Sequence, residues 1–468
     1  MGGLFGVVSK TDCVKELFYG TDYHCHLGTR RGGLAVCGVE GIERSIHDIT
    51  AAQFKSKFAP DLSRMRGRSG IGVISDFEDQ PLIIGSHLGT FAIATVGTVR
   101  NAEALEKKLF KNRSAHFSEM SGNETNPTEI VAALIVAEDS FEAGIASAQR
   151  AIEGSCTILL LTRSGLYAAR DRLGRTPLIV AKTPTGRSVA SETCAFPNVG
   201  HERIRDLGPG EVVLMTPDDI QTIIPPGTVS QICAFLWVYY GYPASSYEGI
   251  NVEWFRHVNG ASLAAADNIK ADGAAGIPDS GTSYAIGYAE RARVPFIRPF
   301  VKYTPTWSRS FMPQNQDDRD LIARMKLIPV RELTEGKRLV FCDDSIVRGT
   351  QLRDTFGRLH AHGAREIHLR IACPPLLHGC RYLNFSRSRS DMDLAARKAV
   401  RELEGDREAA LEDYADPRSG CYAAMVGRIA KSLELSSLTY QSVEGLVKAI
   451  GLPQENLCLY CWTGKSRG

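Results

Sequence analysis

The sequence predicts a chain of two parts, an α+β part followed by an α/β part, because its pattern changes partway along. Short β-type runs recur over the first ~230 residues, among them IGVIS, FAIATVG, CTILLLT and EVVLM. Helical stretches at 128–137 and 141–152 lie between these runs, which indicates antiparallel sheets packed on helices. From about residue 250, helix and strand alternate, a rhythm typical of parallel βαβ units.

The elements of the second part follow from local signals. Residues 339–342 are a short apolar run that predicts a strand. An amphipathic helix is expected from about residue 351, with Gly363 placed to end it, and 366–372 gives the next strand. Residues 383–416 are charged and contain SRSRSDMD, so we expect an exposed, irregular excursion there.

Composition limits the classes of function. The 468 residues suggest two or three domains, and 43% hydrophobic with 23% charged residues is typical of a globular protein. A formal net charge of +2 gives no overall field for nucleic acid or an anionic membrane. No window approaches the ~20 apolar residues of a membrane span, and the N-terminus lacks a signal-peptide pattern. We therefore expect a cytoplasmic protein with no nucleic-acid or membrane partner.

The segment VFCDDSIVRGTQ, residues 340–351, combines a strand, two adjacent acids and a turn into a helix. The start of that helix offers free N–H groups and a positive dipole end to a phosphate. Asp343 and Asp344 can accept hydrogen bonds from ribose hydroxyls or hold them through Mg²⁺, and Gly349 allows close approach of the backbone. The alternative is a solvated turn with an acidic cap. We predict a site for a phosphorylated ribose.

DDSIVRGT resembles the phosphoribosyl pyrophosphate signature of type I phosphoribosyltransferases, and in full it resembles the glutamine phosphoribosylpyrophosphate amidotransferase family. The resemblance implies an α/β type I phosphoribosyltransferase domain at 231–468. It also implies that the substrate is bound by Asp343, Asp344, Ser345, Ile346, Val347, Arg348, Gly349 and Thr350. GIPDSGTSYAIGYAERARVPF, residues 276–296, resembles the family's pyrophosphate loop, which adds Asp279, Ser280 and Gly281.

KYTPTWSRSF, residues 302–311, resembles the family's flexible loop, which implies that Lys302 and Arg309 meet the diphosphate. The family reads K-N-R-Y-V-G-R-T-F here, whereas this chain is one residue longer and departs at Pro305, Trp307 and Ser308. The implied reaction is displacement of pyrophosphate from the anomeric carbon by ammonia, with Mg²⁺ neutralising the diphosphate. No protein nucleophile is needed.

The chain has 12 cysteines, and Cys458 and Cys461 form a C-x-x-C pair. Thiolates in a reducing compartment suit an iron–sulfur cluster or zinc. The contexts of Cys233, Cys380 and the terminal pair resemble the cluster positions of the family, which implies a structural 4Fe–4S cluster. Zinc and no metal remain alternatives. The remaining cysteines are expected to be inert core thiols.

The first half resembles the family's N-terminal-nucleophile glutaminase domain in GLFGVVSK, LGTRRGG, RDRLGRTPL and SVASETCAF, which implies a sandwich domain at 1–230. That chemistry needs an N-terminal cysteine whose own α-amino group is the base. Here Gly2 stands at the cysteine position. The family's H-x-R-Y-x-T is matched by GIGVISD at 70–76, and its H-N-G-N by TVGTVRN at 95–101. We predict that glutaminase activity is absent.

Two further groups of residues in this half have both a functional and a structural interpretation. Cys13 and Cys25 lack a neighbouring α-amino base, which argues against a replacement nucleophile. His24 and His26 could suggest a metal, although histidines beside a cysteine in this setting are more often structural.

Two functions follow. The first is an enzyme that makes 5-phosphoribosylamine from phosphoribosyl pyrophosphate and ammonia, free or from a separate glutaminase, as the first step of purine biosynthesis. The second is a non-catalytic paralogue that binds phosphoribosyl pyrophosphate and regulates or scaffolds an active amidotransferase. Leu236, Tyr242 and Ala244 replace the family's Glu, Arg and Asp where the halves are expected to meet, which suggests weaker coupling. The resemblance also implies a homo-oligomer.

Overall fold

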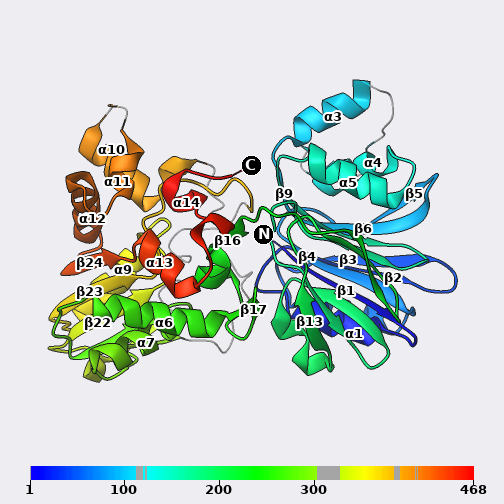
Figure 1. Ribbon diagram of the computed structural model, residues 1–468. Coiled ribbons are helices and arrows are strands. Elements are labelled where there is room, and N and C mark those ends of the chain that lie inside the picture. Colours follow the sequence, from blue (N-terminus) through cyan, green and yellow to red (C-terminus); the bar gives the residue numbers. More distant parts are fainter. Residues whose placement is uncertain are drawn as a thin grey trace.

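A computed structural model describes residues 2–111, 117, 120–121, 124–302, 327–383, 390–405, 407 and 409–467. Two groups of sheets lie side by side, one built from the earlier part of the chain and one from the later part (Figure 1). Within the described residues, no helix has the length and apolar content needed to cross a membrane.

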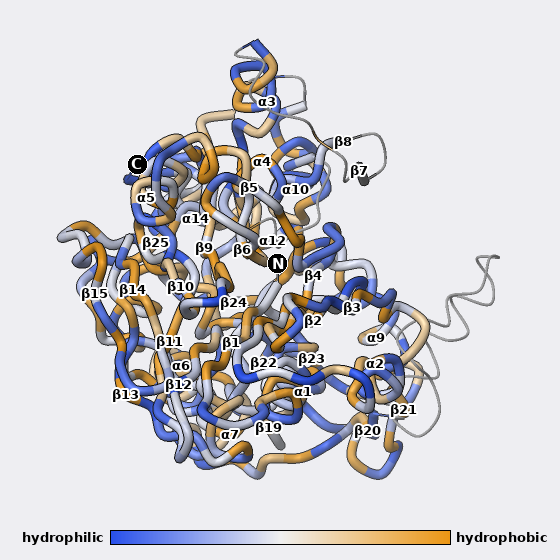
Figure 2. The backbone as a smooth tube through the Cα atoms, turned by 90° about the vertical axis from the view of Figure 1, so that its right-hand side faces the viewer, coloured by the Kyte–Doolittle hydropathy of each residue, from blue (hydrophilic) through white to orange (hydrophobic). Residues whose placement is uncertain are grey.

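The first group contains two antiparallel sheets. The first sheet has seven strands in the order β13-β11-β12-β1-β4-β2-β3: β1 (Gly3–Ser9), β2 (Arg31–Cys37), β3 (Ile42–Asp48), β4 (Ser69–Ser75), β11 (Ile179–Lys182), β12 (Gly186–Ala190) and β13 (Glu202–Asp206). The second sheet has six strands in the order β15-β14-β10-β9-β6-β5: β5 (Leu82–Ser86), β6 (Gly89–Val99), β9 (Gly154–Leu161), β10 (Leu166–Ala169), β14 (Val212–Met215) and β15 (Ile220–Ile224). Edge strand β13 is charged and largely hydrophilic, which discourages pairing with another chain (Figure 2).

The alternation of side chains along these strands creates a four-layer sandwich. On β9, Leu159 and Leu161 enter the core between the two sheets, whereas Ile158 and Leu160 enter the core on the other face. That other face is covered by α3 (Ala102–Lys111), α4 (Pro127–Val136) and α5 (Phe141–Ala151). The far face of the first sheet is covered by α1 (Val14–Asp22) and α2 (Phe54–Leu62). The helices expected at 128–137 and 141–152 are present as α4 and α5. The first begins and ends one residue earlier than expected, and the second ends one residue earlier.

The later part of the chain is built on a parallel sheet of four strands in the order β19-β22-β23-β24. Its strands are β19 (Gly273–Gly276), β22 (Arg338–Asp343), β23 (Glu366–Ile371) and β24 (Ser437–Tyr440). Its main helices are α6 (Val252–Ala265), α7 (Thr282–Ala292), α9 (Thr350–Ala361), α12 (Gly420–Ser432) and α13 (Val443–Ile450). The strands expected at 339–342 and 366–372 and the helix from 351 are confirmed. Gly363 adopts φ +84° just past that helix.

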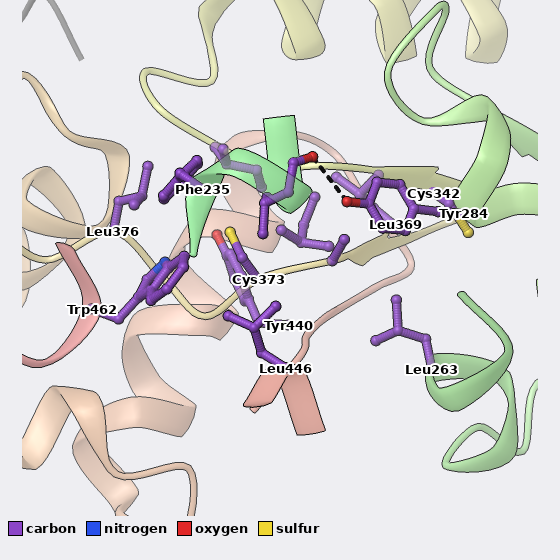
Figure 3. Close-up of a cluster of buried hydrophobic side chains, with 14 of the residues drawn as sticks. Phe235, Leu263, Tyr284, Cys342, Leu369, Cys373, Leu376, Tyr440, Leu446 and Trp462 are labelled. Atoms are coloured by element: carbon purple, nitrogen blue, oxygen red, sulfur yellow. Dashed lines mark hydrogen bonds between the residues drawn. The ribbon is translucent and has the colours of Figure 1, made fainter. Parts of the chain in front are cut away.

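One core serves this part, and its buried members all come from residues 232–462. Phe235 stacks on Trp462 with ring centroids 5.0 Å apart, so residues from the start and the end of this part pack in the same core (Figure 3). The hydroxyl of Tyr284 donates to the carbonyl of Val238 at 2.9 Å, which satisfies a buried polar group.

Residues 383–416 were expected to be irregular, and the structure corrects this for the part it describes. It contains η5 (Asp391–Asp393), α10 (Ala395–Glu404) and α11 (Leu411–Ala415). Ala396, Ala399 and Val400 are buried, which gives α10 an apolar stripe at helical spacing. The stripe is made of small residues, and the many charges around it conceal it in the sequence.

The remaining elements are short connections. They are β7 (Met120–Ser121), β8 (Glu124–Thr125), η1 (Thr193–Ala195), η2 (Pro197–Val199), β16 (Ile232–Cys233), η3 (Leu236–Tyr240), β17 (Ser246–Tyr247), β18 (Ile250–Asn251), β20 (Phe300–Lys302), β21 (Leu327–Pro329), η4 (Arg331–Leu333), η6 (Gln454–Asn456), β25 (Leu457–Cys458) and α14 (Tyr460–Thr463).

The earlier and later parts are joined by specific hydrogen bonds. The Tyr247 hydroxyl donates to the buried carboxylate of Glu192 at 2.7 Å, and the backbone N–H of Cys194 donates to Ser245 Oγ at 3.1 Å. Arg170, which is 1% exposed, pairs with Glu248 at 2.7 Å. These contacts between the halves are made despite the departures at 236, 242 and 244.

Glycines set the distance between α6 and α7, and this yields a test of the packing. A Cβ at Gly260 would lie 2.0 Å from the carbonyl oxygen of Tyr284, whereas a Cβ at Gly357 in α9 would meet nothing within 4 Å. We expect Gly260→Ala to lower the free energy of unfolding by about 1–3 kcal/mol through overpacking. Gly357→Ala should raise it by about 0.5–1 kcal/mol, since alanine favours helix. Denaturant titrations of both variants check this, and equal effects would contradict the packing described.

Candidate functional site

The acidic pair at the end of β22 is buried and meets the neighbouring loop. Asp343 and Asp344 are each 6% exposed. Asp343 Oδ1 accepts hydrogen bonds from the backbone N–H of Asp344 at 2.9 Å and from Ser280 Oγ at 3.3 Å. Asp344 Oδ1 accepts from Ser345 Oγ at 2.6 Å. The structure thus brings together two segments that the sequence analysis assigned to one site, 63 residues apart in the case of Ser280 and Asp343.

The parallel sheet accounts for this meeting. β19 pairs with β22 in parallel, with Gly276 opposite Cys342, so the loop that follows β19 emerges beside the end of β22. The backbone N–H of Ile277 donates to the carbonyl of Cys342 at 2.9 Å. A Cβ at Gly281 would lie 2.1 Å from that same carbonyl oxygen, so only glycine lets the loop run this close to the strand.

Burial gives the two carboxyls unusual electrostatics. It raises the pKa of Asp343 well above its ordinary value, and the charge of Asp344 raises it further. Burial also raises the pKa of Asp344, while hydrogen bonds from Ser280 and Ser345 act in the opposite direction. Two carboxylates this close repel each other, so the site favours protons, ligand hydroxyls or a cation between them.

The segment after the acids forms the expected turn into α9. Ile346 is buried and anchors the turn, and the carbonyl of Val347 accepts from the N–H of Ala395 at 2.7 Å. Gly349 has φ +78°, a conformation that glycine adopts without strain, and α9 begins at Thr350. Arg348 is exposed and lies 3.7 Å from Asp393. α9 therefore begins six residues after Asp344, and its first N–H groups lack partners within the helix.

Lys302 reaches the loop that follows β19, where its ammonium pairs with the carboxylate of Asp279. Both side chains are largely exposed. Arg309, and the departures at Pro305, Trp307 and Ser308, lie outside the described residues.

Sequence reasoning missed Arg256, which lies on α6 and is 4% exposed. Its guanidinium donates to the carbonyls of Trp237, Tyr239 and Gly241, each at 3.0 Å. Its positive charge also lowers the pKa of Asp344. A lone arginine on the otherwise buried face of the helix was the available signal, but nothing in the sequence connects it with residue 344.

The four cysteines assigned to a cluster come from distant segments and meet near the chain end. Cys233 and Cys458 are opposite each other in the parallel pair β16–β25. A side-chain hydrogen bond with Cys380, followed by burial, raises the pKa of Cys461. Burial and then the charges of Cys458 and Cys380 raise the pKa of Cys233. Each thiol therefore lies within electrostatic reach of the others.

No group of three or more His, Cys, Asp or Glu side chains among the described residues is arranged to hold a metal ion. A single ion needs its sulfurs around one point at bonding distance, whereas a cluster of four irons spreads its ligands over a larger volume. By ligand chemistry alone, a set of four thiols suits an iron–sulfur cluster or zinc.

The elements expected to have lost glutaminase chemistry line one cavity of about 880 Å³ in the earlier half. Its walls include Gly2, Ser75, Asp76, Thr95 and Gly97. A Cβ on Gly2 would lie 2.4 Å from the carbonyl oxygen of Ile74. The backbone of β4 therefore leaves no room for a side chain at position 2.

The other candidates in this half have structural roles. Burial raises the pKa of Cys13 far above its usual value, which leaves an unreactive thiol in the core. Burial lowers the pKa of His24 to about 4, and its Nδ1 lies 2.8 Å from the carbonyl of Gly20. His26 Nε2 lies 3.0 Å from Glu192, and Cys25 is half-buried beside Asp22.

Comparison with known proteins extends this description. A family model described as "Glutamine amidotransferase domain" matches residues 68–198. Amidophosphoribosyltransferase of Methanocaldococcus jannaschii is 30% identical over 99% of this chain and 97% of its own length. That of Bacillus subtilis is 30% identical over 99% of this chain and 93% of its own. The solved structure of the B. subtilis glutamine phosphoribosylpyrophosphate amidotransferase, complexed with ADP and GMP, matches with a TM-score of 0.84 and 29% identity, over 99% of this chain and 96% of that one.

The likeness over the whole chain confirms the expected fold class, an α+β sandwich of N-terminal-nucleophile type followed by an α/β type I phosphoribosyltransferase domain. Since relatives at 30% identity match from end to end, the chain belongs to the amidophosphoribosyltransferase family.

Proposed function

We propose that this protein makes 5-phosphoribosylamine from phosphoribosyl pyrophosphate and ammonia, the first step of purine biosynthesis, without a glutaminase of its own. The observation that carries the proposal is the hydrogen-bonded set of Ser280, Asp343 and Asp344, in which the pyrophosphate loop meets the ribose-phosphate turn. The name shared by the relatives supports the reaction class.

In this reaction the ammonia nitrogen forms a bond to the anomeric carbon while the bond from that carbon to the diphosphate oxygen breaks. Pyrophosphate takes the bonding electrons, and the proton lost from nitrogen goes to solvent or to pyrophosphate. Asp343 and Asp344 would hold the ribose hydroxyls or Mg²⁺, and bound Mg²⁺ would neutralise the diphosphate. The N–H groups from 345 to 350 would hold the 5′-phosphate, and the loop at 279–281 the leaving group. Lys302 and Arg309 would add positive charge there.

We place the domain boundary at 230/231 and assign 1–230 to a glutaminase-like domain that is inactive. The separation of the buried cores supports this division, because the core of the later part begins at Ile232. The lack of space at Gly2 supports inactivity, since a thiol there would need a displaced β4. Ammonia would then be free or come from a separate glutaminase.

A structural 4Fe–4S cluster on Cys233, Cys380, Cys458 and Cys461 is part of the proposal. The mutual charge effects of the four thiols support it. All 12 cysteines are free, which suits a reducing, cytoplasmic location. A homo-oligomer stays a prediction.

The second candidate is a non-catalytic paralogue that binds phosphoribosyl pyrophosphate and regulates an active amidotransferase. The departures at 305, 307 and 308, in the segment that resembles the flexible loop, favour it. Ligand binding without turnover, with an active homologue co-purifying, would select this function over the first.

Turnover is tested with phosphoribosyl pyrophosphate, Mg²⁺ and ammonium. The protein should release pyrophosphate, and Asp343→Asn should slow release by at least about 10²-fold, because charge opposite the developing cation is lost. Asp279→Asn is a matched control on an exposed carboxylate, expected to have a smaller effect. Absence of release by the unaltered protein would contradict the enzyme proposal.

The buried acid pair should also make stability depend on pH. The folded-state pKa of Asp343 lies above the unfolded value of about 3.9, so its charge destabilises the fold progressively as pH rises from about 4 through the folded-state pKa. Asp343→Asn should therefore unfold at a higher temperature than the unaltered protein at pH 8, with a smaller difference at pH 5. Thermal melts without ligand measure this. A difference that does not change with pH would show that the carboxyl is not destabilised by burial.

Restoring the missing cysteine should not restore glutaminase activity. Gly2→Cys places a side chain against the carbonyl of Ile74. The segments at 70–76 and 95–101 still lack the residues of the family's H-x-R-Y-x-T and H-N-G-N motifs. We expect no glutamate from glutamine, while ammonium-dependent pyrophosphate release persists. Glutamate production by Gly2→Cys would show that the site is intact apart from its nucleophile.

The cluster is tested by iron and sulfide analysis and absorbance of anaerobically purified protein. About four irons per chain are expected. Cys461→Ser should lower iron content, whereas Cys421→Ser, a half-buried cysteine on α12, should not. Fully folded protein without iron rejects the cluster, and one zinc per chain would replace it with a single-ion site.

A further inference from the structure

A pocket of about 240 Å³ lies where the start of α9 meets α10 and α12. α10 and α12 pack against each other at the outer edge of the later half (Figure 1). Three buried residues of the core line the pocket, namely Ala399, Ile429 and Leu433. Part of the pocket wall is therefore apolar and belongs to the packed interior, which lowers the dielectric on that side.

The charged side chains that line this pocket are mostly positive. Arg348 comes from the turn before α9 and Arg353 from α9 itself, whereas Lys398 comes from α10 and Arg428 from α12. Glu402 is the one carboxylate among the described residues of the wall, and it already pairs with Arg428. Three of the four cations therefore have no carboxylate within the pocket wall.

Partners outside the wall do little to balance these cations in the part of the chain that the structure describes. The guanidinium of Arg348 lies 3.7 Å from the carboxylate of Asp393, and both side chains are largely exposed, so this attraction is weak. Arg353 and Lys398 form no ion pair with a described residue. Like charges held around one hollow repel each other, and a wall of low dielectric concentrates their field. An anion in the pocket would relieve this repulsion.

The start of α9 adds a second source of positive potential. Gly349 and Thr350 line the pocket. α9 has 12 residues, and Gly349, at its N-cap, offers no side chain to accept from the first turn. The first N–H groups therefore carry the positive end of the helix dipole without a cap. Because a dipole acts through space, it favours an anion in this pocket as well as one at the turn.

The pocket and the acidic pair lie at different parts of the turn. A Cβ at Gly349 would lie 3.5 Å from Leu433 Cδ2, so this face of the turn is directed toward α12. Asp343 and Asp344 do not line the pocket, and neither does Ser280, which donates to Asp343. An anion in the pocket would therefore not occupy the place of the ribose.

We propose that this pocket binds a phosphate or diphosphate group, held by Arg348, Arg353 and Lys398, at a site separate from the one assigned to phosphoribosyl pyrophosphate. A guanidinium can donate two parallel hydrogen bonds to phosphate oxygens, and an ammonium adds a point charge. The volume is below the ~300 Å³ at which pockets for whole small molecules begin. The pocket thus suits a phosphate or diphosphate group better than a complete nucleotide. The inference does not depend on the proposed turnover.

The experiment titrates inorganic pyrophosphate into the full-length protein without Mg²⁺, at constant ionic strength, and follows binding by calorimetry. One double variant, Arg353→Gln with Lys398→Gln, removes two charges from the pocket. Its matched control, Arg401→Gln with Lys431→Gln, removes two exposed charges from α10 and α12 outside the pocket wall. We expect the pocket variant to lose one binding event or to weaken it at least about tenfold. The control should bind as the unaltered protein does.

Asp343→Asn separates the pocket from the phosphoribosyl site, because it should keep the binding event that the pocket variant loses. The inference is overturned if the unaltered protein binds no pyrophosphate, if the pocket variant binds as the unaltered protein does, or if both double variants weaken binding equally. Loss of the event in Asp343→Asn alone overturns it as well. Absence of turnover in the unaltered protein leaves these results unaffected.

Glycerol 2-phosphate, titrated in the same way, identifies the source of the phosphate group. Binding that the pocket variant weakens, but the control does not, would show that the pocket accepts the phosphate of an organic molecule. Binding of pyrophosphate alone would assign the pocket to the inorganic ion.

Discussion

The burial of two adjacent carboxyls at the end of β22 is the constraint on which the later half depends. Asp343 and Asp344 are almost inaccessible to solvent, and burial raises the pKa of both. Isolated charge in such a place costs several kcal/mol unless it is paired. The fold offsets part of this cost with the hydroxyls of Ser280 and Ser345 and the charge of Arg256. A sugar or cation would contribute the remaining partners. Burial of the two carboxyls would thus both destabilise the ligand-free fold and favour binding of such a ligand.

Residues from both halves contact the last residues of the chain. The later half supplies the cysteines, and Trp462 stacks on Phe235 there. The earlier half supplies Arg175, whose guanidinium donates to Ser466 Oγ at 3.2 Å, and Arg170, which forms an ion pair with Glu248. An inactive first domain would therefore still be needed, because its removal would leave Ser466 without Arg175 and Glu248 without Arg170. These contacts would explain in physical terms why the sandwich is kept even without glutaminase activity.

Much of the fold and of the candidate site could be predicted from the sequence. The parts that could not be predicted have identifiable physical reasons. The strand, acids, turn and helix at 340–351 are contiguous, so local pattern was enough. The contact between Ser280 and Asp343 needed the parallel register of β19 and β22, which resemblance could suggest but spacing could not. Arg256 stayed hidden because its partners are backbone carbonyls, which carry no sequence signature. The helix α10 was missed because alanines form most of its buried stripe.

The carbonyl oxygen of Ile74 lies so close to Gly2 that a cysteine could not simply be placed at this position. A codon change can return cysteine in one step, but β4 would also have to shift away from that position, and β4 is hydrogen-bonded to β1 on one side and β2 on the other. Neither the cysteine alone nor the strand shift alone would give a thiol that fits at position 2. If, as proposed, the chain has no glutaminase activity of its own, this backbone constraint would make its nitrogen supply depend on other molecules.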